Sequence, residues 1–322
     1  MKDSEARSGT ALTQAPQFPR RLNTGPAWFW FLLPAGVITL VFFFAPVIIT
    51  LVISATNMST ITGLTRWEWV GFGNYERLLS LPQTVRRFWI TLRYVLFTLV
   101  FFNVGMALLI ALITTHIPRQ LGTFFRAVWL LPRITPVVAY VFMWQIMAAA
   151  PPHGVITSNI LEPLGGPTGN LLPANAFLFI VLVNGFIGAS FGMIIFTSAI
   201  ESIRQDIMVA SLVDGASKLQ RIRYIILPQI RWPLLFVTTY QTLSLLTSYE
   251  QILVLTGGRW GTEVWALWAF NVGLDDYYGF FQYGLGAAIA AVLVIMGILF
   301  ALLYMRYFRF NELLHEPRID VL

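Results

Sequence analysis

The sequence of 322 residues contains no cysteine. This absence excludes a disulfide framework, a thiolate metal site and a cysteine nucleophile. Charged residues are also scarce: they make up 11% of the chain, against about 25% in soluble globular domains. Because so few charges cannot cover a globular surface in water, the composition argues against a soluble enzyme, a disordered protein and a nucleic-acid-binding protein.

The sequence also lacks motifs typical of nucleotide-binding, metal-binding and catalytic sites. No Gly-Lys-Ser or Gly-Lys-Thr phosphate-binding loop occurs, so the chain is not expected to be an ATPase itself. The three histidines, His116, His153 and His315, are scattered without acidic partners or metal-ligand spacing. No nucleophile–base pair stands out either. We therefore predict no catalytic residue, no metal site and no cofactor bound by this chain.

Long apolar runs dominate what is present. A helix needs about 20 apolar residues to cross the hydrocarbon core of a bilayer. Six runs meet this requirement, at about 28–55, 89–113, 125–149, 177–199, 233–255 and 283–308. The first is too long for a cleaved signal peptide and contains Pro34 and Pro46. The sequence predicts an all-α membrane protein with six transmembrane helices.

The distribution of Lys and Arg predicts the orientation of these helices. Basic residues gather before the first run, after the second and fourth runs, and after the sixth, whereas residues 150–176 contain none. The positive-inside rule therefore places both termini in the cytoplasm and the third connection outside. The same rule accounts for the net charge of +6, so the charge does not indicate that the chain binds nucleic acid. We expect a flexible cytoplasmic tail over 1–27, a transmembrane domain over 28–310 and a cytoplasmic tail over 311–322.

Residues 201–231 form a connection between two runs that is too patterned for a linker. Apolar residues around Val209 precede Asp214 and Gly215, which predict a helix end and a sharp corner with positive φ. Ser217 is placed to cap a second short helix, which Pro228 ends. Two short cytoplasmic helices with a glycine corner are predicted, and such a projection needs a protein partner.

This segment resembles the EAA loop of permease subunits in binding-protein-dependent ABC importers. The family pattern is Glu-Ala-Ala, three residues, Gly, nine residues, Ile, one residue, Leu-Pro. The matching positions here are Val209, Ala210, Ser211, Asp214, Gly215, Ala216, Ser217, Ile225, Leu227 and Pro228. The resemblance covers roughly residues 28–310 and is nearest to the maltose-type and glycerol-phosphate-type carbohydrate permeases.

Val209 stands where the family usually has Glu, which the family uses to engage the ATPase. Either the partner ATPase lacks the matching polar group, or a paired permease supplies the ionic contact.

The resemblance implies a type I ABC importer permease fold in a bacterial inner membrane. It further implies two copies of a separate ATPase subunit, which bind ATP and Mg, a second homologous permease and an extracytoplasmic solute-binding protein. The chain itself would be a transport subunit and no enzyme, forming half of the path for a sugar or oligosaccharide.

Pocket positions of the family carry over onto two runs. In the fourth run they are Ile187, Gly188 and Phe191; in the fifth they are Gln241, Ser244, Leu245 and Ser248, followed by Tyr249 and Glu250. The four positions from Gln241 to Ser248 share one helix face. This polar face either lines the solute path or bonds neighbouring helices. Glu250 is either a hydrated side chain at a turn near the outer end of the run or an acceptor of hydrogen bonds from a solute.

Two glycines and several arginines allow more than one interpretation. The spacing of Gly188 and Gly192 predicts close helix packing, with a ligand role as the alternative. Arg93 and Arg133 are placed near the ends of runs, where basic side chains reach the interface; a role in drawing an anionic solute is the alternative. The external arginines Arg86, Arg87 and Arg93 leave an acidic oligosaccharide or a phosphorylated polyol as an alternative solute.

Two other classes of protein were weighed against this interpretation. An ion-coupled secondary transporter would need internal repeats, or broken helices with ionisable residues at mid-membrane. An intramembrane hydrolase or glycosyltransferase would need paired acids, histidine or a Ser–Lys pair within the runs. The sequence shows none of these patterns apart from Glu250.

Overall fold

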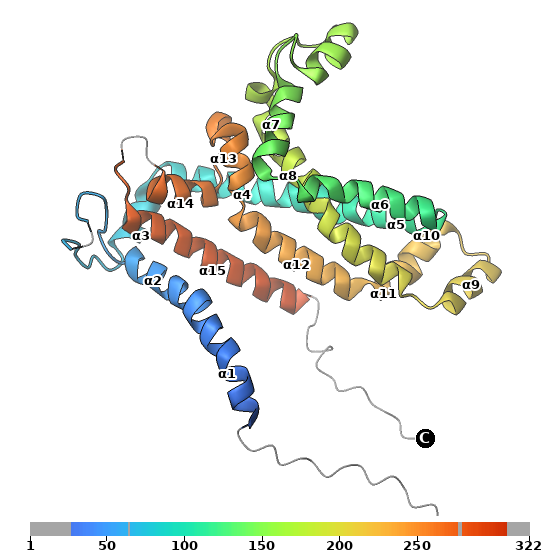
Figure 1. Cartoon of the computed structure of the whole chain (residues 1–322), viewed down its shortest axis with the longest axis horizontal. Coiled ribbons are helices and arrows are strands. Elements are labelled where there is room, and N and C mark those ends of the chain that lie inside the picture. Colours follow the sequence, from blue (N-terminus) through green and yellow to red (C-terminus); the bar gives the residue numbers. More distant parts are fainter. Residues whose placement is uncertain (1–26, 64, 276–278, 308–322) are drawn as a thin grey trace, which may run out of the picture. The chain divides into compact units, whose positions relative to one another are not determined.

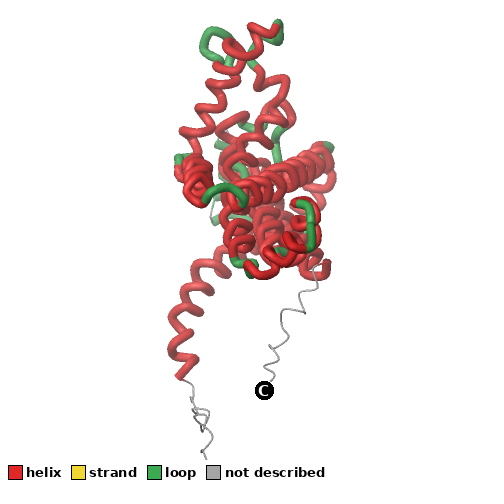
Figure 2. The backbone as a smooth tube through the Cα atoms, turned by 90° about the vertical axis from the view of Figure 1, so that its right-hand side faces the viewer, coloured by secondary structure: helices red, strands yellow, loops and turns green. Residues whose placement is uncertain are grey.

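The computed structural model describes residues 27–63, 65–275 and 279–307, which are almost entirely helical (Figures 1 and 2). The predicted C-terminal tail, and all but the last residue of the predicted N-terminal tail, lie outside the described residues. No strand occurs among the described residues, where a single antiparallel bridge joins Thr56 and Trp69. The all-α prediction is confirmed for this part of the chain.

The chain divides into two compact units, residues 1–49 and 50–322. In the first unit, α1 (Ala27–Thr39) passes through the π-helix η1 (Leu40–Phe44) into α2 (Ala45–Ser54), which crosses the boundary. Large apolar side chains such as Phe31 and Phe42 are exposed along this helix. Exposed apolar surface of this kind suits a helix that lies in lipid or against another chain.

Three further helices in the second unit are long and apolar enough to cross a membrane. One combines α4 (Gln83–Phe97), the π-helix η2 (Thr98–Met106) and α5 (Ala107–Thr115). The others are α8 (Leu171–Glu201) and α15 (Tyr283–Tyr307). With the helix of the first apolar run, the described residues contain four such helices, or five if one bent pair is a single span.

The predicted single helix over 125–149 is wrong. The structure has two helices there, α6 (Arg119–Ile134) and α7 (Val137–Ala148), bent by 100° at the break between them. Thr135 adopts an extended conformation, as residues before proline prefer to do, and Pro136 then starts α7. In Figure 1, α7 stands steeply away from α6.

The predicted single helix over 233–255 is also wrong. α12 (Arg231–Thr247) ends at an extended Ser248, and α13 (Glu250–Thr256) begins two residues later. A further apolar helix, α14 (Trp265–Leu274), precedes α15 and was not anticipated from the sequence. The Trp265 indole donates a hydrogen bond to the Ile289 carbonyl of α15 at 2.8 Å, so α14 is anchored on the last long helix.

Small residues let the long helices approach closely. A Cβ atom at Gly192 would lie 2.5 Å from the Asn103 carbonyl oxygen and 2.8 Å from the Ala107 Cβ. At Gly185 it would overlap the Phe102 ring. The packing interpretation of Gly192 is confirmed, and α8 packs directly against η2 and α5.

Candidate functional site

A cavity of about 270 Å³ opens at the break between α6 and α7. Five residues that the sequence assigned to a solute pathway line it: Ile187 and Gly188 of α8, with Gln241, Ser244 and Leu245 of α12. The Gln241 Nε2 donates a hydrogen bond to the Gly188 carbonyl oxygen at 2.8 Å. The structure thus brings the two predicted groups of residues to one place. Gly188 packs against Asn103, as its spacing predicted, and it also lines the cavity; its ligand role stays a prediction.

The other four pathway predictions do not line this cavity. Phe191 stacks on Tyr240, a lining residue, with ring centroids 4.7 Å apart. Tyr249 instead stacks on Phe270 of α14 at 4.8 Å. Glu250 is exposed at the start of α13. The fourth, Ser248, lies at the end of α12 rather than within it, so the single helical face predicted from Gln241 to Ser248 stops at Leu245.

Ser248 belongs to a partly buried hydrogen-bond network. The Asn184 Nδ2 of α8 donates to the Ser248 Oγ at 2.8 Å and to the hydroxyl of the fully buried Tyr94 in α4. The Ser248 Oγ in turn donates to the Gln251 Oε1 of α13 at 2.9 Å. These bonds satisfy polar groups at the α12–α13 break and fix both helices to α8.

Sequence reasoning missed several lining residues, which come from elements far apart in the chain: Asn103, Tyr140, Asn184, Tyr240 and Gln251. Arg133, which also lines the cavity, was considered only at the end of a run, with an anionic solute as the alternative role. Asn103 is 1% exposed and its Oδ1 has no hydrogen-bond partner. Isolated amides within apolar runs, as at Asn103 and Asn184, were the available signal, because a buried amide needs a partner or a function. The cavity therefore presents amides, hydroxyls and one guanidinium between aromatic and aliphatic walls.

A second, exposed cluster corresponds to the predicted two short helices. The chain forms α9 (Gln205–Val213), then α10 (Lys218–Arg221), the π-helix η5 (Ile222–Ile226) and α11 (Leu227–Gln229). Gly215 has φ +72° between them. The Ser217 Oγ accepts the Gln220 N–H at 3.3 Å, and the Gln220 Oε1 accepts the Ser217 N–H at 2.8 Å. The predicted corner and cap are confirmed. We call residues 205–229 the coupling segment.

The coupling segment presents an unusual apolar surface. Val209 and Leu212 are each 56% exposed and Val213 is 83% exposed, whereas Ser211 is buried. Among its other matched positions, Ala210, Asp214, Ser217 and Pro228 are exposed and Ala216, Ile225 and Leu227 are partly buried. Gly215, with Asp214, Ala216, Tyr224 and Ile225, also borders a hollow of about 320 Å³. Large exposed apolar side chains in a polar setting mark a protein contact.

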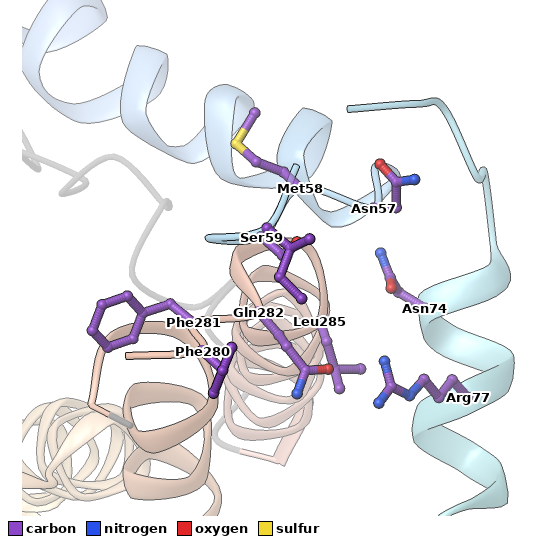
Figure 3. A pocket seen from close by; sticks show the side chains of 10 residues that line it. Asn57, Met58, Ser59, Asn74, Arg77, Phe280, Phe281, Gln282 and Leu285 are labelled. Atoms are coloured by element: carbon purple, nitrogen blue, oxygen red, sulfur yellow. The ribbon is translucent and has the colours of Figure 1, made fainter. Parts of the chain in front are cut away.

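A third cavity, of about 350 Å³, lies between α3 (Gly73–Ser80) and the start of α15 (Figure 3). The Asn74 Nδ2 donates to the Ser54 and Thr56 carbonyl oxygens at 2.9 and 2.7 Å. Asn74 therefore fixes the turn after α2. In Figure 1, α3 and α9 lie at opposite ends of the second unit.

No group of three or more metal-ligating side chains occurs within the described residues. Three ion pairs are formed there, between Arg87 and Glu263, Arg126 and Glu201, and Arg204 and Asp206. Arg87 also lies 4.3 Å from the Trp268 ring centroid and its Nε donates to the Glu263 Oε2 at 2.6 Å. Arg87 thus has a structural partner.

Residues 103–312 match the family described as binding-protein-dependent transport system inner membrane component. The matched region contains the cavity-lining residues and the coupling segment. The chain belongs to this family of ABC importer permeases.

Curated relatives and solved structures agree with this assignment. The trehalose/maltose transport system permease protein MalF of Thermococcus litoralis is 30% identical over 87% of this chain and 93% of its own length. The sulfoquinovosyl glycerol transport system permease protein SmoG of Agrobacterium fabrum is 26% identical over 93% of this chain and 96% of its own. A crystal structure of a bacterial ABC transporter that imports the acidic polysaccharide alginate shares the fold, with a TM-score of 0.74, 21% identity, and coverage of 88% of this chain and 95% of that chain.

Proposed function

We propose that this chain is a permease subunit of an ATP-driven ABC importer and forms half of the translocation path for a sugar or oligosaccharide. One observation carries this proposal. This member of the family has both a polar cavity between long apolar helices and an exposed coupling segment with a glycine at its corner. The cavity would hold the solute during passage, and the coupling segment would receive the mechanical work of ATP hydrolysis.

A carbohydrate suits the chemistry of the cavity. Hydroxyl and amide groups from Ser244, Gln241 and Asn184 are present at its wall, and Tyr240 offers an aromatic face. Sugars present hydroxyl groups around an apolar ring face, so mixed polar and aromatic walls are what their sites need. The names of the relatives, which include trehalose/maltose and sulfoquinovosyl glycerol permeases, support the same class.

The coupling segment would dock in a cleft of a separate ATPase subunit, of which the importer has two copies. ATP and Mg would be held there, and this chain would act as a transport subunit without enzymatic activity. The exposed Val209 and Leu212 would contribute hydrophobic burial to the contact, at about 25 cal/mol for each Å² removed from water.

In the proposed topology the chain crosses a bacterial inner membrane six times, with both termini in the cytoplasm. The bent pair α6–α7 would form the third crossing and α12 with α13 the fifth. Lys218, Arg221 and Arg223 of the coupling segment fit a cytoplasmic position under the positive-inside rule.

Two further subunits complete the proposed importer. Ser244 is exposed although it lines the cavity, as expected if a second homologous permease closes the other side. A solute-binding protein would deliver the sugar at the external end, opposite the coupling segment.

Transport assays with the purified complex test this function. The chain should co-purify with an ATPase and a second permease, and in proteoliposomes the complex should accumulate a labelled carbohydrate only with enclosed ATP and an external binding protein. A panel of maltose, trehalose and acidic oligosaccharides serves as probes. Uptake driven by a proton or sodium gradient without ATP would instead identify a secondary transporter.

Replacing Ser244 by Leu should lower the initial uptake rate about fivefold or more. A lost hydrogen bond is worth about 1 kcal/mol, and the larger side chain narrows the cavity. Ser198→Leu is the matched control, because Ser198 is an exposed serine of α8 that does not line the cavity. Equal uptake by both variants and the wild-type complex would show that Ser244 faces away from the path.

A further inference from the structure

Arg133 carries the one charge on the wall of the cavity among the described residues that line it. It lies in the last turn of α6, just before the bend into α7. Its guanidinium carbon lies 5.5 Å from the centre of the Phe191 ring, and Phe191 stacks on Tyr240. The cation therefore lies beside the aromatic face that suits a sugar ring.

The Arg133 guanidinium of α6 lies beside Phe191, which is within α8 rather than at either end of that helix. Phe191 precedes Glu201, the last residue of α8, by ten residues, which corresponds to about 15 Å of helix at about 1.5 Å per residue. Charged groups within membrane-spanning helices are costly and are retained where they face a water-filled path or a ligand.

Arg133 has no ion-pair partner among the described residues, in contrast to three arginines that do. Arg87, Arg126 and Arg204 each form an ion pair with a carboxylate. No ion pair joins Arg133 to an acid within the described part of the chain, and no acidic side chain lines the cavity. Glu250, the acid in the predicted pathway, is exposed and lies outside the lining. The cavity wall of this chain thus has a charge of +1 without a protein counter-ion.

We propose that the transported carbohydrate is anionic and that Arg133 binds its acidic group during passage. This inference rests on the proposed transport function and specifies its substrate class. A planar guanidinium donates paired hydrogen bonds to a carboxylate or sulfonate in one orientation. Ser244 and Tyr240, which also line the cavity, supply hydroxyls for the rest of the sugar. The Arg133 side chain is exposed and can therefore pair with the acidic group of a sugar, whereas a neutral sugar offers it no charge to pair with.

The single positive charge favours one kind of anion. Carboxylate and sulfonate groups carry one negative charge, which Arg133 balances. A phosphate monoester carries about −1.5 to −2 at neutral pH, so a single guanidinium would leave it partly uncompensated. The substrate class is therefore a uronic-acid or sulfonated sugar rather than a phosphorylated polyol.

The test uses the complete importer in proteoliposomes with enclosed ATP and measures initial uptake of three labelled probes: maltotriose, galacturonate, which carries a single carboxylate, and glycerol 3-phosphate. The wild-type complex should import galacturonate in preference to the other two. Arg133→Gln should lower galacturonate uptake about tenfold and change maltotriose uptake less than twofold. Arg133→Lys, which keeps the charge but loses the paired donors, should give an intermediate rate.

Arg93→Gln is the matched control. Arg93 is likewise exposed and lies 5.9 Å from the ring centre of a phenylalanine, Phe177, but it does not line the cavity. The control should transport all probes at wild-type rates, and each complex is normalised to its bound ATPase.

The outcomes separate this inference from the proposed function. Equal loss of acidic and neutral uptake in Arg133→Gln would overturn the inference, as would a wild-type preference for maltotriose or glycerol 3-phosphate. With either result the complex would still be an ATP-driven importer, so the proposed function would stand. Absence of ATP-driven uptake of every carbohydrate by an assembled wild-type complex would overturn the proposed function itself.

Discussion

A Gly215→Val variant should insert into the membrane and assemble, yet lose most of its substrate-stimulated ATP hydrolysis. Gly215 has φ +72° at the corner between α9 and α10. The left-handed region costs an ordinary residue about 1–2 kcal/mol and is a greater strain for a β-branched one. Valine should therefore open the corner and turn the two halves of the coupling segment away from each other. We expect stimulation of ATP hydrolysis by the loaded binding protein to fall at least about tenfold.

The surroundings of Gly215 make a matched comparison possible. A Cβ atom there would meet nothing within 4 Å, so the backbone conformation and not steric overlap decides the effect. Gly215→Asn adds a side chain of similar size that tolerates the left-handed region, and it should keep near wild-type coupling. Equal loss in both variants, or normal stimulation in Gly215→Val, would contradict the proposed role of the corner.

The coupling segment could be predicted in detail because its signals are local. The dihedral angle at Gly215 and the reciprocal hydrogen bonds of Ser217 and Gln220 involve residues within a few positions of one another. Turn and cap chemistry depends on such neighbours alone. The apolar face around Val209 was predicted from the same local pattern, and the structure leaves Val213 of that face exposed.

The long apolar runs were less informative about helix continuity. Hydropathy measures apolar content, and the run over 125–149 is apolar although Pro132 and Pro136 lie within it. The break at Ser248 has no proline or glycine beside it. It depends on Asn184 and Tyr94, which are distant in sequence and satisfy the polar groups there. A break stabilised by tertiary contacts cannot be read from local propensity.

Part of the candidate site was implied by the family resemblance, and helical periodicity placed those positions on one face. Gln241, Ser244 and Leu245 share a face of α12 and line the cavity together. Periodicity cannot identify Arg133 or Asn103 as their neighbours, because those residues come from other helices. Arg133 lies in the last turn of α6, next to the 100° bend at which the cavity opens, and a prediction of one straight helix contains no such bend.

Replacing Gly192 by Leu should destabilise the second unit more than any surface change. The new Cβ would lie 2.5 Å from the Asn103 backbone oxygen and 2.8 Å from the Ala107 Cβ. Neither atom is the end of a flexible side chain, so α8 would have to separate from η2 and α5. Overpacking costs about 1–3 kcal/mol or more, and about 2–4 °C of melting temperature follows from each kcal/mol. We expect the apparent melting temperature of the purified complex to fall by about 5 °C or more.

Gly36→Leu is the control for the same chemical change within a helix. Gly36 lies in α1, and a Cβ atom there would meet nothing within 4 Å. Leucine is a better helix former than glycine by roughly 0.5–1 kcal/mol, so this variant should match or slightly exceed the wild-type melting temperature. Gly192→Ala should fall between the two, because the first added carbon already meets the Asn103 carbonyl. An unchanged melting temperature in both Gly192 variants would mean that α8 and η2 are farther apart than the structure places them, and the walls of the cavity beside them would have to be redrawn.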